Sequence, residues 1–183
     1  MQRIAVVGNA GSGKSTLARR LADGLGLRHV ELDAIFHQPG WQPLPEATFR
    51  ARVEDAVRAD RWVVCGNYGA VRDLVWPRAD TIVWLDLPRR VVTPRIVRRS
   101  VVRAITRREL WNGNREEWRN LLSADPERSI VLWSITQHAT NRAGYRRRLL
   151  DDPPQDVEVV HLRSPGAVRR WLRATLSAAR PAG

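Results

Sequence analysis

The stretch AVVGNAGSGKSTLARRL, residues 5–21, indicates the fold of this chain more strongly than any other. Its start belongs to an apolar run typical of a buried strand, and residues 15–24 carry leucine and alanine at helical spacing. Between the two, residues 8–15 match the pattern G-x-x-x-x-G-K-[ST] in full. Glycines let the backbone turn tightly, so its N–H groups and the helix N-terminus point at one site that binds phosphate. We therefore expect a strand, a phosphate-binding loop and a helix.

This loop predicts that the chain binds a nucleoside triphosphate, ATP, together with Mg²⁺. The Lys14 ammonium would reach the β- and γ-phosphates, and the Ser15 hydroxyl would hold the metal. Lys14 is also the only lysine among 31 basic residues. The predicted nucleotide-binding residues of this loop are Gly8, Asn9, Ala10, Gly11, Ser12, Gly13, Lys14, Ser15 and Thr16.

Composition indicates one domain over residues 1–183, and a hydrophobic fraction of 43% excludes a disordered chain. The net charge of +12 favours anionic partners such as phosphates, nucleotides or nucleic acid. All the basic residues except Lys14 are arginine, and such a bias is also typical of a GC-rich genome. The apolar runs are too short to cross a membrane, and Cys65 has no second cysteine to pair with. The chain also begins directly in a strand-like segment, without room for a signal peptide. We expect a cytoplasmic protein with no membrane partner.

Apolar runs alternate with helix-length segments along the chain, which predicts a parallel sheet covered by helices, an α/β fold. The expected strands are residues 3–7, 29–32, 62–65, 81–85 and 157–162. The expected helices are residues 15–24, 46–59, 69–76, 88–110, 125–150 and 164–179, with a proline-containing loop over 33–45. Ligands of such sheets bind at the carboxyl ends of the strands, where the phosphate-binding loop also lies.

Two classes of triphosphate-binding protein are disfavoured by the sequence. A Ras-type GTPase needs an N-K-x-D motif, and no lysine other than Lys14 is present. A motor or AAA-type ATPase is usually longer. A small kinase remains, which needs an acceptor site near the second and third strands and arginines over the phosphates. Asp33, at the end of the second strand, is the candidate to face the acceptor or the metal.

The segment after the fourth strand is rich in arginine. Arg95, Arg99 and Arg103 recur every four residues and so share one helix face. We expect a lid over about residues 95–120 that closes on the phosphates and excludes water, and a solvated arginine face is the alternative. Pro94 predicts either a helix capped by Thr93 or a kinked helix.

Five stretches carry a resemblance to a known family over nearly the whole chain: GNAGSGKSTLARRLA, HVELDAIFHQPGW, RWVVCGNYGAVRDLVWPRADTIVWLDLPRR, RRELWNGNREEW and VVHLRSPGAVRRWL. The chain resembles small P-loop kinase-like proteins known as adenylate kinase-related or DNA topology modulation proteins. The resemblance implies a three-layer α/β/α P-loop NTPase fold of the nucleoside monophosphate kinase type. Its five parallel strands would lie in the order 2-3-1-4-5, with a lid after the fourth strand. The implied activity is ATP-dependent transfer to a small acceptor.

The resemblance also implies roles for particular residues. Asp33 matches the family's Asp after the second strand, within an acceptor segment of about residues 33–60. Asn67, Tyr68 and Arg72 match the acceptor-binding stretch, with pairing of Arg72 to Asp73 or Asp33 as the alternative. Arg163 and Gly166 match the loop behind the adenine base, and capping of the last helix is the alternative for that loop.

Cys65 departs from the family pattern, which has an Asp that would complete the Mg²⁺ site. A thiol is a poor ligand for this hard cation. Either Asp33 or Asp86 then serves the metal, or phosphoryl transfer is impaired.

We therefore expect a kinase that transfers the γ-phosphate of Mg·ATP to a small, anionic or nucleotide-like acceptor. Its expected catalytic residues are Lys14, Asp33, Arg95, Arg99 and Arg103, with Ser15 and Asp33 at the metal. A nucleic-acid-associated ATP-binding regulator is one alternative, although no DNA- or RNA-binding motif supports it. A nucleotide-binding pseudokinase is the other. The acceptor and the oligomeric state are left open.

Overall fold

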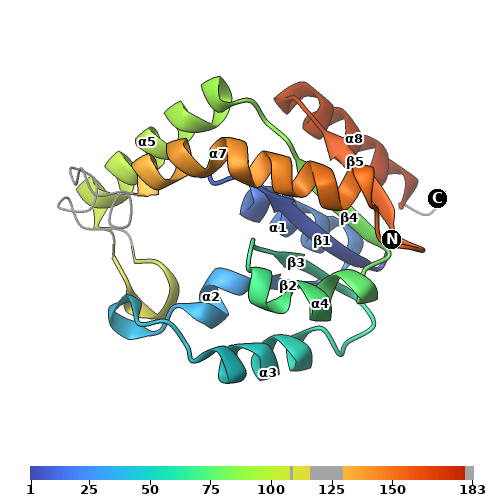
Figure 1. Ribbon diagram of the computed structural model, residues 1–183, viewed down its shortest axis with the longest axis horizontal. Coiled ribbons are helices and arrows are strands. Elements are labelled where there is room, and N and C mark those ends of the chain that lie inside the picture. The colour runs from blue at the N-terminus through green and yellow to red at the C-terminus, as the bar shows by residue number, and fades with distance from the viewer. Residues whose placement is uncertain (108, 116–129, 180–183) are drawn as a thin grey trace.

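The computed structural model describes residues 1–107, 109–115 and 130–179. Its five strands pair in parallel in the order β2-β3-β1-β4-β5, which confirms the expected topology (Figure 1). The strands are β1 (Arg3–Gly8), β2 (Arg28–Glu31), β3 (Trp62–Cys65), β4 (Thr81–Leu85) and β5 (Glu158–Leu162). This parallel pairing places the ends of β1, β2 and β3 at one edge of the sheet.

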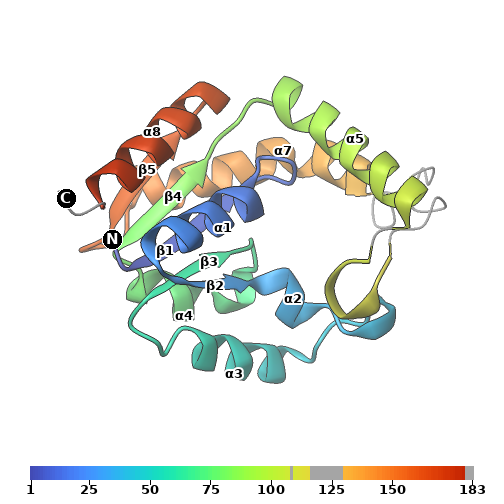
Figure 2. The same ribbon diagram turned by 180° about the vertical axis from the view of Figure 1, so that it is seen from behind.

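Helices cover both faces of the sheet, as Figures 1 and 2 show. The helices are α1 (Lys14–Leu25), α2 (Leu32–Phe36), α3 (Glu46–Ala56), α4 (Arg72–Val75), α5 (Arg89–Thr106), α7 (Ile130–Arg146) and α8 (Pro165–Ala178). Short 3₁₀ turns at Pro39–Trp41, Gly69–Val71, Trp76–Arg78 and Trp111–Gly113 and a π turn at Arg147–Asp151 complete the described elements. Among the described residues, no helix is both long and apolar enough to span a membrane.

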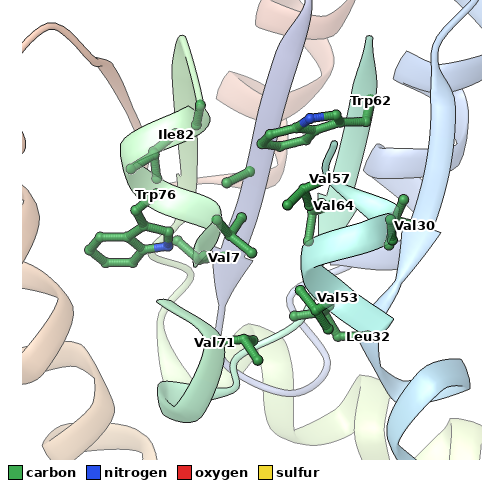
Figure 3. Packing of buried hydrophobic residues seen from close by; sticks show 14 of the residues in the cluster. Val7, Val30, Leu32, Val53, Val57, Trp62, Val64, Val71, Trp76 and Ile82 are labelled. Carbon is green, nitrogen blue, oxygen red and sulfur yellow. The ribbon is translucent and has the colours of Figure 1, made fainter. Parts of the chain in front are cut away.

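Two cores lie on opposite faces of the sheet because successive strand residues point to opposite sides. Ile4 and Val6 of β1 pack with Leu17 and Leu21 of α1 and with Leu172 of α8. On the other face, β-strand residues pack with side chains of α3, α4, Tyr145 and Leu149. Figure 3 shows part of this second core, with Val53 and Val57 near Val64 and with Trp76 near Ile82. The two cores hold the sheet edge that carries the phosphate-binding loop.

The structure corrects the expectations for residues 33–45 and 46–59. The segment 33–45 is not all loop, because residues 32–36 form helix α2 with Asp33 in its first turn. Leu32, Ile35 and Phe36 are apolar at helical spacing and pack against the core, whereas the prolines begin only at Pro39. Helix α3 ends at Ala56, three residues earlier than expected.

Helix α5 continues through Pro94, so Thr93 does not cap a new helix there. The helix instead begins after Pro88, and Pro94 is exposed in its second turn. The expected helix start at residues 125–127 lies outside the described residues. The last helix begins as expected, with the Ser164 hydroxyl accepting a hydrogen bond from the Ala167 N–H at 3.1 Å.

Candidate active site

The phosphate-binding loop runs from the end of β1 to the first turn of α1. Gly11 and Gly13 have φ angles of 73° and 95°, which favour glycine. A Cβ on Gly11 would lie 2.6 Å from the Ile96 side chain and 2.7 Å from the Val92 carbonyl oxygen. Helix α5 therefore packs directly on this loop, and only glycine fits at the contact.

The polar groups of the loop suit a phosphate ligand. The Lys14 ammonium donates to the carbonyl oxygens of Gly8 and Asn9 at 2.7 and 3.1 Å, so its side chain folds back over its own loop. Burial lowers the pKa of Lys14 to about 8. The Ser12 hydroxyl is buried without a hydrogen-bond partner among the described residues. A bound phosphate would satisfy the Ser12 hydroxyl and return charge to Lys14.

Charged groups of three other segments affect the pKa of Lys14. Burial has the largest effect on the pKa of Lys14, the carboxylates of Asp33 and Glu31 oppose it, and the Arg99 guanidinium adds to it. Asp33 and Arg99 are thus close enough to Lys14 for their charges to affect its pKa.

Cys65 lies against Ser15, where the resemblance implies an acidic residue. The thiol donates to the Ser15 hydroxyl at 3.9 Å, and the His29 Nε2 lies 3.5 Å from Sγ. Burial raises the pKa of Cys65 to about 12, so the thiol stays neutral at physiological pH. Cys65 therefore adds no negative charge for a metal.

Asp86, one of the two carboxylates considered for the metal, is committed elsewhere. Its Oδ1 accepts from Arg142 Nε at 2.7 Å, and its Oδ2 accepts from Arg142 Nη2 at 3.1 Å and lies 2.9 Å from His161 Nε2. Burial alone would raise the pKa of Asp86, but the hydrogen bonds from Arg142 and His161 outweigh burial and lower it. These contacts join Asp86, after β4, to α7 and β5, and the metal role considered for Asp86 stays a prediction.

Asp33 is held by Tyr68. The Tyr68 hydroxyl donates to Asp33 Oδ1 at 2.7 Å, and it lies 3.4 Å from His37 Nε2. Burial and the Asp33 charge raise the pKa of Tyr68 above its usual range, so Tyr68 remains a donor. Asp33 Oδ2 accepts no hydrogen bond from any described residue, which leaves this oxygen available to a ligand.

Glu31 is a site residue that sequence reasoning missed. It ends β2 opposite Cys65 in the β2–β3 register, and it accepts a hydrogen bond from Trp111 Nε1 at 3.0 Å. The second strand was expected to end at residue 32, so Glu31 was not recognised as the residue at the strand end. The sequence feature that could have identified Glu31 is its pairing with Asp33, since these are two carboxylates two residues apart where a strand ends.

Asn67 braces the phosphate-binding loop. Its Nδ2 donates to the Gly8 carbonyl oxygen at 2.6 Å, and its Oδ1 accepts from the Gly8 N–H at 3.3 Å. Both polar groups of this amide therefore contact backbone.

Arg72 lies on helix α4 with its guanidinium 5.1 Å from the ring centre of Trp76. Burial and then the charge of Arg148 lower its pKa. Among the described contacts, Arg72 pairs with neither Asp73 nor Asp33. Asp73 instead accepts two hydrogen bonds from Arg50, and Asp33 accepts one from Tyr68. Arg72 also lines an open groove of about 620 Å³ together with Gly69, Asp73, Trp76, Pro77, Pro154 and Gln155. No residue of the phosphate-binding loop lines this groove.

The expected lid is described in part. On α5, Arg95 is exposed, and Arg99 and Arg103 are half-buried. Residues 108 and 116–120 lie outside the described residues. At the other end of the chain, Arg163 is exposed, and the Ser164 cap of α8 is the described contact of its loop. The nucleotide-binding role of Arg163 and Gly166 stays a prediction.

Residues 109–115, which we name the Asn-Gly-Asn loop, dock onto residues 31–41, which we name the acceptor loop (Figure 2). Asn112 Nδ2 donates to the Ala34 and His37 carbonyl oxygens, and Asn114 Nδ2 donates to that of Gln38 at 2.9 Å. Trp41 donates from its backbone N–H to Asn114 Oδ1 at 2.8 Å and from Nε1 to the Arg115 carbonyl oxygen at 3.2 Å. Part of the expected lid therefore contacts the expected acceptor segment.

Comparison with known proteins finds similarity to kinases that act on small molecules. The chain is 31% identical over 140 residues to a cytidylate kinase of Pyrococcus furiosus, covering 67% of this chain and 72% of that protein. It is 36% identical over 102 residues to a shikimate kinase of Halorhodospira halophila, covering 47% and 57%. A shikimate kinase structure from Bacteroides thetaiotaomicron matches the fold with a TM-score of 0.58 at 13% identity, covering 97% of each chain. No protein-family model matches the chain.

These relatives favour a kinase over both a nucleic-acid-associated regulator and a pseudokinase. They support the expected P-loop kinase family, and the narrower resemblance to adenylate kinase-related or topology modulation proteins stays a prediction. The chain thus belongs to the P-loop kinase family that includes the Pyrococcus cytidylate kinases, and it is a phosphotransferase.

Proposed function

We propose that this kinase transfers the γ-phosphate of Mg·ATP to a hydroxyl group of a small molecule held at Asp33. The observation that carries the proposal is the environment of Asp33. Tyr68 orients one of its carboxylate oxygens, and the other is available to a ligand. The charge of Asp33 also affects the pKa of Lys14. A phosphate-binding lysine and an oriented carboxylate are the groups that phosphoryl transfer to a hydroxyl requires.

The phosphate-binding loop, residues 8–16, would hold the triphosphate through its backbone N–H groups, the Ser12 hydroxyl and Lys14. Among the described residues, no three His, Cys, Asp or Glu side chains gather as a metal cage. Mg²⁺ commonly uses only one or two protein oxygens together with the phosphates, and Ser15 with Asp33 or Glu31 fits that donor set. Bound Mg²⁺ would neutralise the charge on the phosphates.

Asp33 Oδ2 would accept the proton of the acceptor hydroxyl while the oxygen of that hydroxyl forms a bond to the γ-phosphorus. The bond from that phosphorus to the β–γ bridging oxygen breaks, and ADP leaves with that electron pair. Arg99, whose charge affects the pKa of Lys14, would stabilise the negative charge on the transferred group, with Arg95 and Arg103 on the same face of α5 as further candidates.

Other segments of this single domain would complete the site. Asn67, Tyr68 and Arg72 border the acceptor segment of about residues 33–60, and residues 95–120 would act as the lid. Arg163 and Gly166 would lie behind the adenine ring.

The test is an acceptor panel that includes cytidine monophosphate, shikimate, gluconate and neutral sugars, with ADP formation as the readout. We expect one acceptor to stimulate ADP formation, and Asp33→Asn to reduce that rate by about 10²–10⁴-fold. Asp60→Asn, which changes an exposed carboxylate before β3, is the matched control and should keep the rate. The proposal fails if the protein binds ATP but no acceptor stimulates ADP formation.

A further inference from the structure

We propose that the acceptor is a neutral, hydroxyl-bearing ring compound, such as a sugar or cyclitol, rather than a nucleoside monophosphate. It would lie between the carboxylates of Asp33 and Glu31 and three aromatic rings, those of His37, Trp41 and Trp111, which we name the aromatic trio. This inference rests on the proposed function and names the substrate class of the same site.

The Trp41 ring stands at a steep angle to the other two rings of the aromatic trio, whereas the His37 and Trp111 rings are nearly parallel, with planes at 20°. The centres of the Trp41 and Trp111 rings lie 6.4 Å apart with their planes at 84°, and those of His37 and Trp41 lie 5.3 Å apart at 77°. All three residues are only partly buried, so the rings remain accessible in part. Sites that bind small molecules combine such aromatic walls with a few polar groups of fixed orientation.

Hydrogen bonds orient both indole rings. Trp111 donates its Nε1–H to Glu31, and Trp41 donates its Nε1–H to the Arg115 carbonyl oxygen. With both N–H groups used, the ring faces offer only apolar and π contact to a ligand. His37 Nδ1 is buried without a hydrogen-bond partner among the described residues, which adds one polar atom beside the rings.

Trp41 also adopts a strained backbone conformation, with a φ of 60°. This left-handed conformation costs a non-glycine residue about 1–2 kcal/mol. The backbone N–H of Trp41 donates to the buried Asn114 of the Asn-Gly-Asn loop, which holds the residue in place. Strain of this kind concentrates at ligand-binding positions.

The charges of the site favour hydroxyl groups over a phosphate. The carboxylates of Asp33 and Glu31 accept hydrogen bonds, so they suit the O–H donors of a polyol and repel a phosphate. A nucleoside monophosphate needs a cation for its own phosphate. Three arginines of α3, α4 and the Asn-Gly-Asn loop contact other groups: Arg50 pairs with Asp73, Arg72 lies over Trp76, and Arg115 pairs with Glu109.

The test compares neutral hexoses, pentoses and inositols with cytidine, adenosine and uridine monophosphates at equal concentrations. Acceptor-dependent ADP formation and mass spectrometry of the product are the readouts. We expect product from a neutral ring compound only. Phosphorylation of a nucleoside monophosphate and of no neutral compound would overturn the substrate class and leave the kinase function standing. ATP binding without turnover in either set would overturn both.

Two substitutions at one position test the aromatic trio. Trp111→Leu removes the ring and should raise the KM for the neutral acceptor about 10-fold while the KM for ATP stays unchanged. Trp111→Phe keeps a ring and should raise the acceptor KM less. Equal acceptor KM values in wild type and Trp111→Leu would exclude Trp111 from the acceptor site, and an equal rise in both KM values would indicate a general structural role.

Discussion

The phosphate-binding loop and the acceptor loop differ in how far along the chain their partners lie. Lys14 bonds to carbonyl oxygens five and six residues earlier, whereas the hydrogen bonds that join the acceptor loop to the Asn-Gly-Asn loop span 73 to 80 residues. The phosphate side is therefore one continuous motif that α5 and Asn67 reinforce. The acceptor side exists only where two distant segments meet. Substitutions on the two sides should therefore have separable effects.

On the phosphate side, a large effect on the rate is expected from Lys14→Met. It should reduce ADP formation by about 10²–10³-fold, because it removes the cation that stabilises the transferred phosphate. The folded protein should lose little stability, since the buried ammonium is costly to desolvate. Arg20→Met, at an exposed position of α1, is the control for loss of a positive charge. Equal rates in the two variants would contradict the role of Lys14.

A glycine pair separates backbone strain from packing on α5. Gly11→Ala and Gly13→Ala should each cost about 1–2 kcal/mol of the free energy of unfolding, because both residues have positive φ. A Cβ on Gly13 meets no atom within 4 Å, whereas one on Gly11 meets Val92 and Ile96. Gly11→Ala should therefore cost about 1–3 kcal/mol more, as measured by urea unfolding. Equal losses would mean that α5 does not pack on the loop.

On the acceptor side, Asn114→Ala should weaken the docking of the two loops. The Asn114 side chain is buried and bonds to Trp41 and Gln38, so its loss should cost about 1–3 kcal/mol of the free energy of unfolding. The acceptor KM should rise and the ATP KM should stay constant. Asn112→Ala, at an exposed position of the same loop, should have a smaller effect. A rise in the ATP KM with no change in the acceptor KM would contradict the placement of Asn114 on the acceptor side.

The smallest expected effect is a proton taken up when ATP binds. The pKa of Lys14 is lowered from 10.5 to about 8, so the free protein has lost much of this proton at about pH 9. Bound phosphates favour the charged amine and restore it. Calorimetry in buffers of different ionisation enthalpy should show uptake near zero at about pH 7 and close to one proton at about pH 9. Uptake that is the same at both pH values, or that persists in Lys14→Met, would contradict this.

The same pKa shift has a defined effect on stability. Between about pH 8 and the unfolded pKa of 10.5, the unfolded state binds more protons at Lys14 than the folded state does. The contribution of Lys14 to the free energy of unfolding therefore rises with pH in this window. Below pH 8 both states hold the proton, and the desolvation cost is fully present.

Much of the phosphate side could be predicted from the amino-acid sequence. Strand, loop and helix around Lys14 follow from local apolar patterning and glycine spacing, and the strand order follows from the family resemblance. The errors lie where local signals compete. Prolines from Pro39 onward suggested a loop, while the spacing of Leu32, Ile35 and Phe36 places Asp33 on a helix. The pairing of Asp86 with Arg142 and His161 joins three segments that are distant in the sequence, and no local pattern predicts it.

A contiguous motif carries its own geometry, because each of its backbone conformations depends on neighbouring residues. The sequence therefore sufficed to predict the α/β class and the strand, loop and helix around Lys14. Folding alone decided that Glu31 accepts a hydrogen bond from Trp111, that Asn67 bonds to Gly8, and that Trp111 lies beside His37 and Trp41. These contacts cross from one strand end to another or from one loop to another. They depend on the packing of two cores and a docked loop, which local propensity does not encode.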